Sequence, residues 1–331
     1  MWRLSPLRRF ASIVFAGFLV GVLYTALRAP LALAAGGMTG ASMAAAFYAV
    51  DRFVLRRNAG GLLPPLPFLP YFGVRTALYV GVIVVIDAVV GRLAAGRFVV
   101  IGGDDFLFTV ALVVGVNLLF SVNDLLGPGT LFAFAAGRYH RPRTEERALL
   151  FIDLRSSTVI AERLGELTFL DFLNRFVADV SLAIADAGGE IHKYVGDEII
   201  ATWRLKPGAN EPACVSACFS ALERLRRQSA AYERAFGQAA DFRAGLHCGP
   251  VAVGELGSLK KEIALIGDTM NTTQRIEEAC RATNQRVLAS AALLDRLAAL
   301  PPGVTRRRLG EIAVRGKERP LDLHALEADA T

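Results

Sequence analysis

The chain has 331 residues, of which 53% are hydrophobic, and its mean hydropathy is +0.40. That hydropathy excludes an ordinary soluble protein, so part of the chain should lie in lipid, and the length gives room for about two domains. The net charge of +6 comes from residues 1–143, where 13 Arg face 5 Asp, while residues 144–331 have 24 basic and 26 acidic side chains. Because the positive excess surrounds apolar segments, it indicates membrane topology and argues against a nucleic-acid partner.

Four apolar segments in the first part of the chain are long enough to cross a bilayer. They lie at residues 10–27, 31–50, 72–91 and 105–122. Arginines cluster before the first segment, between the second and third, and after the fourth, so both termini are expected in the cytoplasm. The first apolar run continues past Leu23, which favours a retained span over a cleaved signal peptide. We expect three regions: a multi-pass transmembrane domain at 1–123, a juxtamembrane linker at 124–146 and a globular domain at 147–327.

Polar and ionisable side chains occur in or near these segments, where an ionisable group is costly and often functional. They are Arg75, Asp87, Asn117 and Asn123. A sensing or transport role is one interpretation, and an interfacial position or pairing between helices is the other. The small residues at 36–42 allow close helix packing, either within the chain or in a dimer.

Beyond the linker, where Gly127-Pro128-Gly129 breaks the last span and Arg138 to Arg143 marks the cytoplasmic face, the pattern becomes globular. In chain order it predicts a strand at 147–154, a helix at 158–186, strands within 190–203, a helix at 209–235, strands at 241–248 and 250–256 joined at Gly249-Pro250, a helix at 269–282, and strands at 286–289 and 305–314. The order βαββαβ predicts an α+β fold. We expect a ferredoxin-like sheet with its helices on one face, extended at the C-terminus.

Two aspartates end neighbouring predicted strands. Asp153 follows the apolar run 148–152, and Asp197 lies in a tight turn after Gly196 between the strands of a predicted hairpin. In one interpretation both carboxylates bind cations; in the other, Asp153 only caps the following helix and Asp197 only fills the turn. Glu198 is expected to be a surface residue of its strand.

A polar segment follows Asp153 and precedes a predicted helix, whose first backbone amides would form an anion cradle. It comprises Arg155, Ser156, Ser157 and Thr158. Two carboxylates beside an anion cradle are what a pair of divalent cations and a nucleoside triphosphate need. The pattern therefore predicts a phosphoryl-transfer site.

The cysteines lack any Cys-x-x-Cys or Cys/His zinc spacing. They are Cys214, Cys218, Cys248 and Cys280. We expect reduced and partly buried thiols in the cytosol.

Three motifs together resemble the catalytic domain of class III adenylate and guanylate cyclases. They are Phe151–Thr158, Lys193–Asp197 and Gly267–Arg275, with Gly245–Pro250 between the second and the third. Each motif alone is weak, but three in this order form a specific set, and the similarity covers residues 145–327. The segment from Arg138 to Arg143 is similar to the start of the cyclase domain in bacterial membrane-anchored members.

The resemblance implies that Asp153 and Asp197 hold two Mg²⁺ or Mn²⁺ ions per site, assisted by the backbone carbonyl of Leu154. One ion would lower the pKa of the substrate 3′-hydroxyl, and the other would neutralise the triphosphate. Asn271 and Arg275 are four residues apart and share one face of a helix. In the family, the Asn on this face orients the ribose and the Arg stabilises charge that develops on the α-phosphate.

The same resemblance gives substrate roles to three further positions. Lys317 matches the triphosphate-binding lysine, although a solvated basic face would look the same. Lys193 matches the residue that reads the purine ring. Its usual partner, an Asp or Thr seven positions before the Asn, falls on Ala264, whose side chain accepts no hydrogen bond. The retained lysine favours adenine over guanine, because guanylate cyclases of this family usually have Glu there.

The resemblance thus implies an inner-membrane homodimer that converts ATP to 3′,5′-cyclic AMP and pyrophosphate for intracellular signalling, at active sites shared between the two chains. A guanylate cyclase is an alternative. A diguanylate cyclase is another, although residues 194–199 lack the Gly-Gly pair and the Phe of its motif. A nucleotide-binding membrane receptor or scaffold without turnover is the non-enzyme alternative, and nothing in the sequence demands inactivity. The signal received by the membrane domain is unknown.

Overall fold

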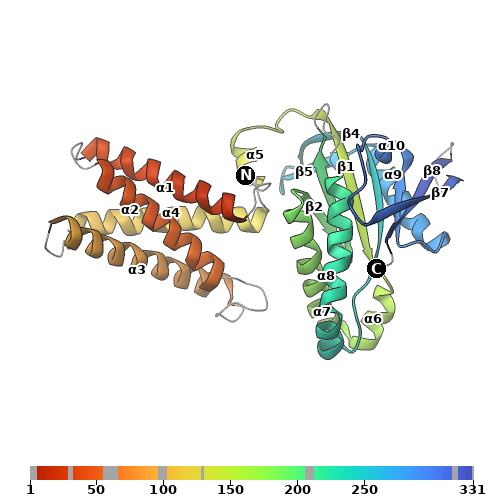
Figure 1. Ribbon diagram of the computed structural model, residues 1–331, viewed down its shortest axis with the longest axis horizontal. Coiled ribbons are helices and arrows are strands. Elements are labelled where there is room, and N and C mark those ends of the chain that lie inside the picture. Colours follow the sequence, from red (N-terminus) through yellow and green to blue (C-terminus); the bar gives the residue numbers. More distant parts are fainter. Residues whose placement is uncertain are drawn as a thin grey trace. The chain divides into compact units, whose positions relative to one another are not determined.

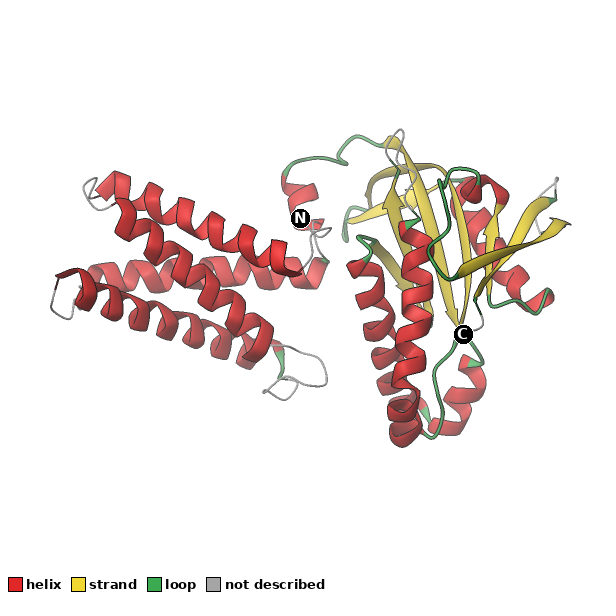
Figure 2. Ribbon diagram, in the orientation of Figure 1, coloured by secondary structure: helices red, strands yellow, loops and turns green. Residues whose placement is uncertain are grey.

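The computed structural model describes residues 6–28, 33–54, 66–95, 103–127, 130–205, 212–314 and 320–329. The chain divides into two compact units, with the boundary between Leu131 and Phe132 (Figure 1). The described part of the first unit is helical, and the second unit combines a sheet with helices (Figure 2).

The N-terminal unit contains four long helices at the four apolar segments. They are α1 (Pro6–Arg28), α2 (Leu33–Ala49), α3 (Phe68–Ala95) and α4 (Gly103–Leu126), and a π-helical turn, η2 (Val50–Val54), continues α2. Among the described residues, one helical segment, Phe68–Val89, is long and apolar enough to cross a membrane. Phe10–Ala26 and Val110–Asn123 are apolar but shorter. One candidate span is therefore found where the sequence predicts four.

Helices α1 and α2 pack closely through glycines. A Cβ atom placed on Gly17 would lie 2.5 Å from the carbonyl oxygen of Gly40, and one on Gly36 would lie 2.7 Å from the carbonyl oxygen of Gly21. Backbones can approach this closely only without side chains between them. The small residues of the second apolar segment are thus used for packing within the chain.

Arg75 of α3 is buried and pairs with a residue of the preceding helical segment. Its Nη2 lies 3.2 Å from Asp51 Oδ2, and its Nε donates to the hydroxyl of Tyr79 at 3.0 Å. On α4, the Asn117 Nδ2 donates to the Thr76 hydroxyl at 2.7 Å. Both polar groups therefore join neighbouring helices, which is the pairing interpretation of these residues.

The C-terminal unit is built on an eight-stranded sheet, which follows the short helix α5 (Thr130–Ala135). Its strands are β1 (Arg143–Leu154), β2 (Glu190–Val195), β3 (Glu198–Arg204), β4 (Phe242–Leu256), β5 (Glu262–Ile266), β6 (Val287–Ser290), β7 (Val304–Ile312) and β8 (Leu321–Ala328). The strand order is β2-β3-β1-β4-β6-β8-β7, with β5 paired to β4. Among the strand pairs that the structure describes, β4 and β6 are parallel and all the others are antiparallel. The predicted βαββαβ order is confirmed in β1 to β4, and β5 to β8 extend it.

Helices cover both faces of this sheet, so the prediction of helices on one face is wrong. The helices are α6 (Ser157–Leu164), α7 (Glu166–Asp186), α8 (Ala213–Phe236), α9 (Asp268–Ala282) and α10 (Ala291–Leu294). Helices α7 and α8 pack against even-numbered residues of β1, such as Leu150 and Ile152. Helix α9 lies on the opposite face, where a Cβ on Gly245 of β4 would be 2.5 Å from the backbone nitrogen of Glu277. Glycine in β4 leaves room for the backbone of α9.

Several element boundaries also differ from the prediction. Strand β1 begins at Arg143, inside the predicted linker 124–146, and not at residue 147. The helix expected at 158–186 is interrupted at Gly165, which separates α6 from α7. The strands expected at 241–248 and 250–256 are one continuous strand, β4. One edge of β4 pairs with β6 at 244–246 and with β5 at 252–256. Pro250 lies in the gap between these two pairings, where a proline without an N–H group is tolerated.

Candidate nucleotide site

Asp153 and Asp197 lie at the same end of neighbouring strands. Asp153 is the last residue but one of β1, and it is in register with Glu198 at the start of the adjacent strand β3. Asp197 occupies the two-residue turn between β2 and β3, after Gly196, whose φ of 62° suits a glycine. The register of one strand pair thus brings two carboxylates from distant parts of the sequence together.

Burial and mutual repulsion raise the pKa values of the carboxyl groups around Asp153. Burial, together with the charge of Asp197 and a hydrogen bond to it, raises the pKa of Asp153 to about 6. Burial, with Asp153 and Asp197 beside it, raises the pKa of Glu198 to about 7. Burial also raises the pKa of Glu277 on α9 to about 8, and the negative charges of Asp153 and Glu198 add to the effect. Glu198 is therefore a half-buried member of an acidic cluster, and the expectation of a surface residue is wrong.

The residues present fit divalent cations. Two carboxylates close enough to share a proton present hard oxygen atoms to one another, and a cation between them would offset their repulsion. In the part of the chain that the structure describes, no group of three or more His, Cys, Asp or Glu side chains is arranged to hold a metal ion. A site with two protein carboxylates is the kind that Mg²⁺ completes with phosphate oxygens of a substrate.

The segment after Asp153 forms the start of α6. Ser156 is its N-cap residue, with a left-handed φ of 59°, and its side chain makes no capping hydrogen bond. Asp153 is therefore not the cap of this helix. The first backbone amides of α6 are those of Ser157 and Thr158, and their use as an anion cradle stays a prediction.

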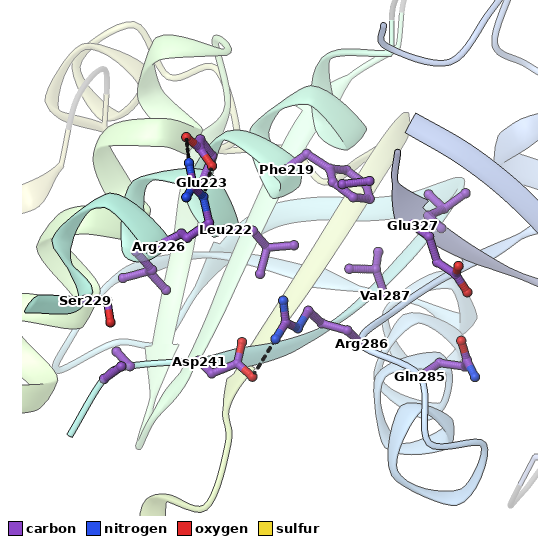
Figure 3. A pocket seen from close by; sticks show the side chains of 15 residues that line it. Phe219, Leu222, Glu223, Arg226, Ser229, Asp241, Gln285, Arg286, Val287 and Glu327 are labelled. Atoms are coloured by element: carbon purple, nitrogen blue, oxygen red, sulfur yellow. Dashed lines mark hydrogen bonds and ion pairs between the residues drawn. The ribbon is translucent and has the colours of Figure 1, made fainter. Parts of the chain in front are cut away.

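The side chain of Arg155 is engaged elsewhere. Its Nη1 donates to Asp241 Oδ2 at 2.7 Å, and Arg286 binds the same carboxylate oxygen at 3.0 Å. Asp241 and Arg286 line a cavity of 680 Å³ between α8, the residues just before β4, the start of β6 and the end of β8 (Figure 3). Its other charged pair, Glu223 with Arg226, is also joined by hydrogen bonds. None of the predicted site residues that the structure describes lines this cavity.

Asn271 and Arg275 lie on α9, as the spacing predicts. Asn271 is exposed, and the Nη1 of Arg275 binds both oxygens of Glu278 at 2.7 and 2.6 Å. Among the described residues, no hydrogen bond or ion pair joins either side chain to Asp153 or Asp197. Glu277 and Arg281, on the same helix, nevertheless lie close enough to Asp153 for their charges and that of Asp153 to interact. Lys317 lies outside the described residues.

Lys193 and Ala264 lie on β2 and β5. The Nζ of Lys193 is 3.2 and 3.4 Å from the two carboxylate oxygens of Glu262, which is two residues before Ala264 on the same strand. Strand β5 was not predicted, because its five residues contain neither a clear alternation nor a turn signal. The contact between Lys193 and Glu262 spans 69 positions of sequence, so no local pattern could have revealed it.

Several residues around the site were missed by sequence reasoning. Arg243 of β4 is in register with Asp153, and it counteracts the rise in the pKa of that carboxyl together with Arg281 of α9. Glu277 was missed because it faces the sheet from a helix 124 positions after Asp153. The adjacency of Glu198 to Asp197, opposite the end of β1, is the one local signal that could have indicated a third acid.

Comparison with known proteins agrees with this geometry. The sequence model of the adenylate and guanylate cyclase catalytic domain matches residues 139–328. Adenylate cyclase 2 of Rhizobium meliloti is 38% identical over 208 residues, which are 62% of this chain and 57% of that protein. An adenylate cyclase of Anabaena cylindrica is 26% identical over 191 residues, 56% of this chain and 37% of that protein.

A solved structure of a bacterial light-regulated adenylyl cyclase has the same fold. It superposes with a TM-score of 0.56 at 19% identity and covers 67% of this chain and 66% of its own. The chain spans little more than half the length of its Rhizobium relative. Since the family's sequence model covers more than half of the residues, this chain belongs to the adenylate and guanylate cyclase catalytic domain family.

Proposed function

We propose that this protein is an adenylate cyclase that converts ATP to 3′,5′-cyclic AMP and pyrophosphate. The observation that carries the proposal is the pair Asp153 and Asp197 at the ends of adjacent strands, in a chain of this family. The 38% identity to an adenylate cyclase over 208 residues supports adenine as the base.

In the proposed site, Asp153, Asp197 and the backbone carbonyl of Leu154 hold two Mg²⁺ or Mn²⁺ ions. When bound, these ions would activate the 3′-hydroxyl and neutralise the triphosphate. The amides at the start of α6 receive phosphate oxygens. The exposed Asn271 orients the ribose, and Arg275 compensates charge on the α-phosphate as the new bond forms.

The active site is proposed to be shared by two chains of a homodimer. Its support is that Asn271 is exposed on α9, and that among the described residues no hydrogen bond or ion pair joins Asn271 or Arg275 to Asp153 or Asp197. A two-fold axis would place Asp153 and Asp197 of one chain opposite Lys193, Asn271 and Arg275 of its partner, twice per dimer. Lys317 would bind the triphosphate from the same side as Asn271.

The N-terminal unit is proposed to anchor the enzyme in the inner membrane through four spans, with residues 147–327 in the cytoplasm. The support is the candidate span Phe68–Val89, the apolar helices on either side of it, and the arginine clusters that flank them. Signals that reach this unit would change the rate of cyclic AMP production. Cyclic AMP would then act as the intracellular second messenger.

The deciding experiment supplies the purified full chain with ATP or GTP, in Mg²⁺ or Mn²⁺, and identifies the product by mass. We expect cyclic AMP and pyrophosphate from ATP, and no product when EDTA removes the cations. Cyclic GMP as the main product would establish the guanylate cyclase alternative. That alternative is tested because the side chain of Ala264 cannot accept a hydrogen bond from adenine. Nucleotide binding without any product would establish the scaffold alternative.

A further inference from the structure

Strand β5 crosses the sheet to reach β2, although β3, β1 and β4 separate the two strands in the sheet order. Ile263 and Leu265 of β5 pack on the sheet face formed by residues such as Leu149 and Phe151. Because side chains alternate along a strand, Glu262 and Ala264 lie together on the other face of β5. The arm formed by β4 and β5 thus carries Glu262 to the side chain of Lys193.

The contact between Lys193 and Glu262 is open to water. The Nζ of Lys193 is 3.2 Å from Oε1 and 3.4 Å from Oε2, and the side chains are 49% and 38% exposed. An ion pair this open to water contributes little to the stability of a fold. A second ion pair on the same arm, between Lys261 and one carboxylate oxygen of Glu255 at 3.4 Å, provides a comparison.

The two charged groups form a donor beside an acceptor. The ammonium of Lys193 only donates hydrogen bonds, and the carboxylate of Glu262 only accepts them. Adenine presents an acceptor at N1 beside the donor amino group at C6, whereas guanine presents a donor at N1 beside an acceptor oxygen at C6. The pair matches adenine at both atoms and opposes guanine at both.

We propose that Glu262, and not the residue at position 264, is the acceptor that works with Lys193 to select adenine. The proposal rests on the proposed function, because it assigns a specificity residue within that same nucleotide site. Two residues along one face of a strand correspond to about 6.6 Å. The longer side chain of Glu262 covers part of this distance between positions 262 and 264, and the small methyl group of Ala264 leaves space for it. The resulting substrate class is the adenine nucleoside triphosphates.

The test measures kcat/KM for ATP and for GTP with the full chain, and compares their ratio between variants. Glu262→Ala should lower the ATP-to-GTP ratio about 10-fold or more, because one discriminating hydrogen bond is lost and one repulsion of guanine is removed. Lys261→Ala removes the comparison pair and should leave the ratio unchanged. Adding Ala264→Asp to Glu262→Ala restores an acceptor on the same strand face and should raise the ratio again.

A second variant guards against loss of structure. Glu262→Gln keeps the length of the side chain but adds a donor, so it should also lower the ratio, and circular dichroism should show an intact fold for each variant. An unchanged ratio in Glu262→Ala and Glu262→Gln, with an active parent protein, overturns the role of Glu262 and leaves the cyclase assignment in place. An equal loss of both activities overturns it too, because that result shows a role in holding the arm. A parent protein that forms no cyclic nucleotide from either substrate overturns the proposed function itself.

Discussion

At the scale of single residues, the end of β1 concentrates negative charge. Burial and neighbouring carboxylates raise the pKa of Asp153, Glu198 and Glu277 to about 6, 7 and 8. The folded state therefore retains protons that the unfolded state has already released, so the free energy of unfolding falls as pH rises from about 4 toward 8. Such a site is unstable by itself at neutral pH and is suited to bind cations.

Replacing Asp153 should separate function from stability. Asp153→Asn should lower cyclase activity at least about 100-fold, because a cation ligand is lost. Without divalent cations at pH 8, the same variant should unfold at a higher temperature than the parent, because one repelled charge is removed. Mg²⁺ or Mn²⁺ should raise the Tm of the parent and not of the variant, as measured by thermal unfolding in detergent.

Asp171→Asn, at an exposed position on α7, is the control, since it removes the same charge away from the cluster. It should change neither the activity nor the response of the Tm to cations. If the cations raised the Tm of Asp153→Asn as much as that of the parent, Asp153 would not be a ligand.

Arg275 should act on the rate rather than on binding of the ground state. Arg275→Ala should reduce kcat about 100- to 1,000-fold with little change in KM, because its charge is needed where negative charge develops. Arg226→Ala removes an exposed arginine of α8, which is likewise paired to a glutamate three positions away on its helix, and should leave kcat within a factor of two. A rise in KM at constant kcat for Arg275→Ala would assign Arg275 to substrate binding alone.

At the scale of elements, backbone contact between α1 and α2 and between α9 and β4 depends on glycine. In both places a Cβ would meet a backbone atom at 2.5 Å. Close contact of this kind stabilises packing through dispersion forces, and it cannot be relieved by rotating a side chain. These two pairs of elements should be among the least tolerant of substitution.

The contact between α1 and α2 can be tested with a matched control. Gly17→Val should destabilise the N-terminal unit by about 1–3 kcal/mol, because the new side chain meets the carbonyl of Gly40. Gly81→Val, on α3, adds the same atoms where nothing lies within 4 Å, and should be tolerated. Thermal unfolding in detergent, followed by far-UV circular dichroism, measures the difference. Equal stability of the two variants would contradict the packing.

At the scale of the whole molecule, two inactive variants should rescue one another if the site is shared. Co-expression of Asp153→Ala and Asn271→Ala in equal amounts makes about half of the dimers mixed, and each mixed dimer has one intact site. Activity should return to about a quarter of the parent value on that count. A co-expressed sample as inactive as either variant alone, with mixed dimers shown by two affinity tags, would falsify the shared site.

The proposed membrane topology makes a separate prediction. With four spans and both termini in the cytoplasm, reporter fusions after Arg57 and after Arg143 should both give a cytoplasmic signal, and a fusion after Arg28 should give a periplasmic one. The contrast arises because Arg28 follows one span, whereas the other two positions follow an even number. A periplasmic signal after Arg143 would rule out four spans with this orientation.

The sequence by itself determined the features that depend on neighbouring residues. The turn at Gly196, the end of β1 at Leu154, next to Asp153, and the helical spacing of Asn271 and Arg275 are local, and each follows from backbone preferences within a few positions. The order βαββαβ could be predicted for the same reason, because each strand and helix has its own periodicity.

Only the tertiary structure decided the contacts between distant segments. The burial of Glu198 and Glu277, the position of α9 on the second face of the sheet and the reach of Glu262 to Lys193 depend on strand order and on the path of the β4–β5 arm. Energies of this kind come from packing and desolvation between elements that lie tens of residues apart, and no local pattern records them. For that reason the sequence indicated Lys193 without its partner, and only the structure showed that Glu262 contacts it.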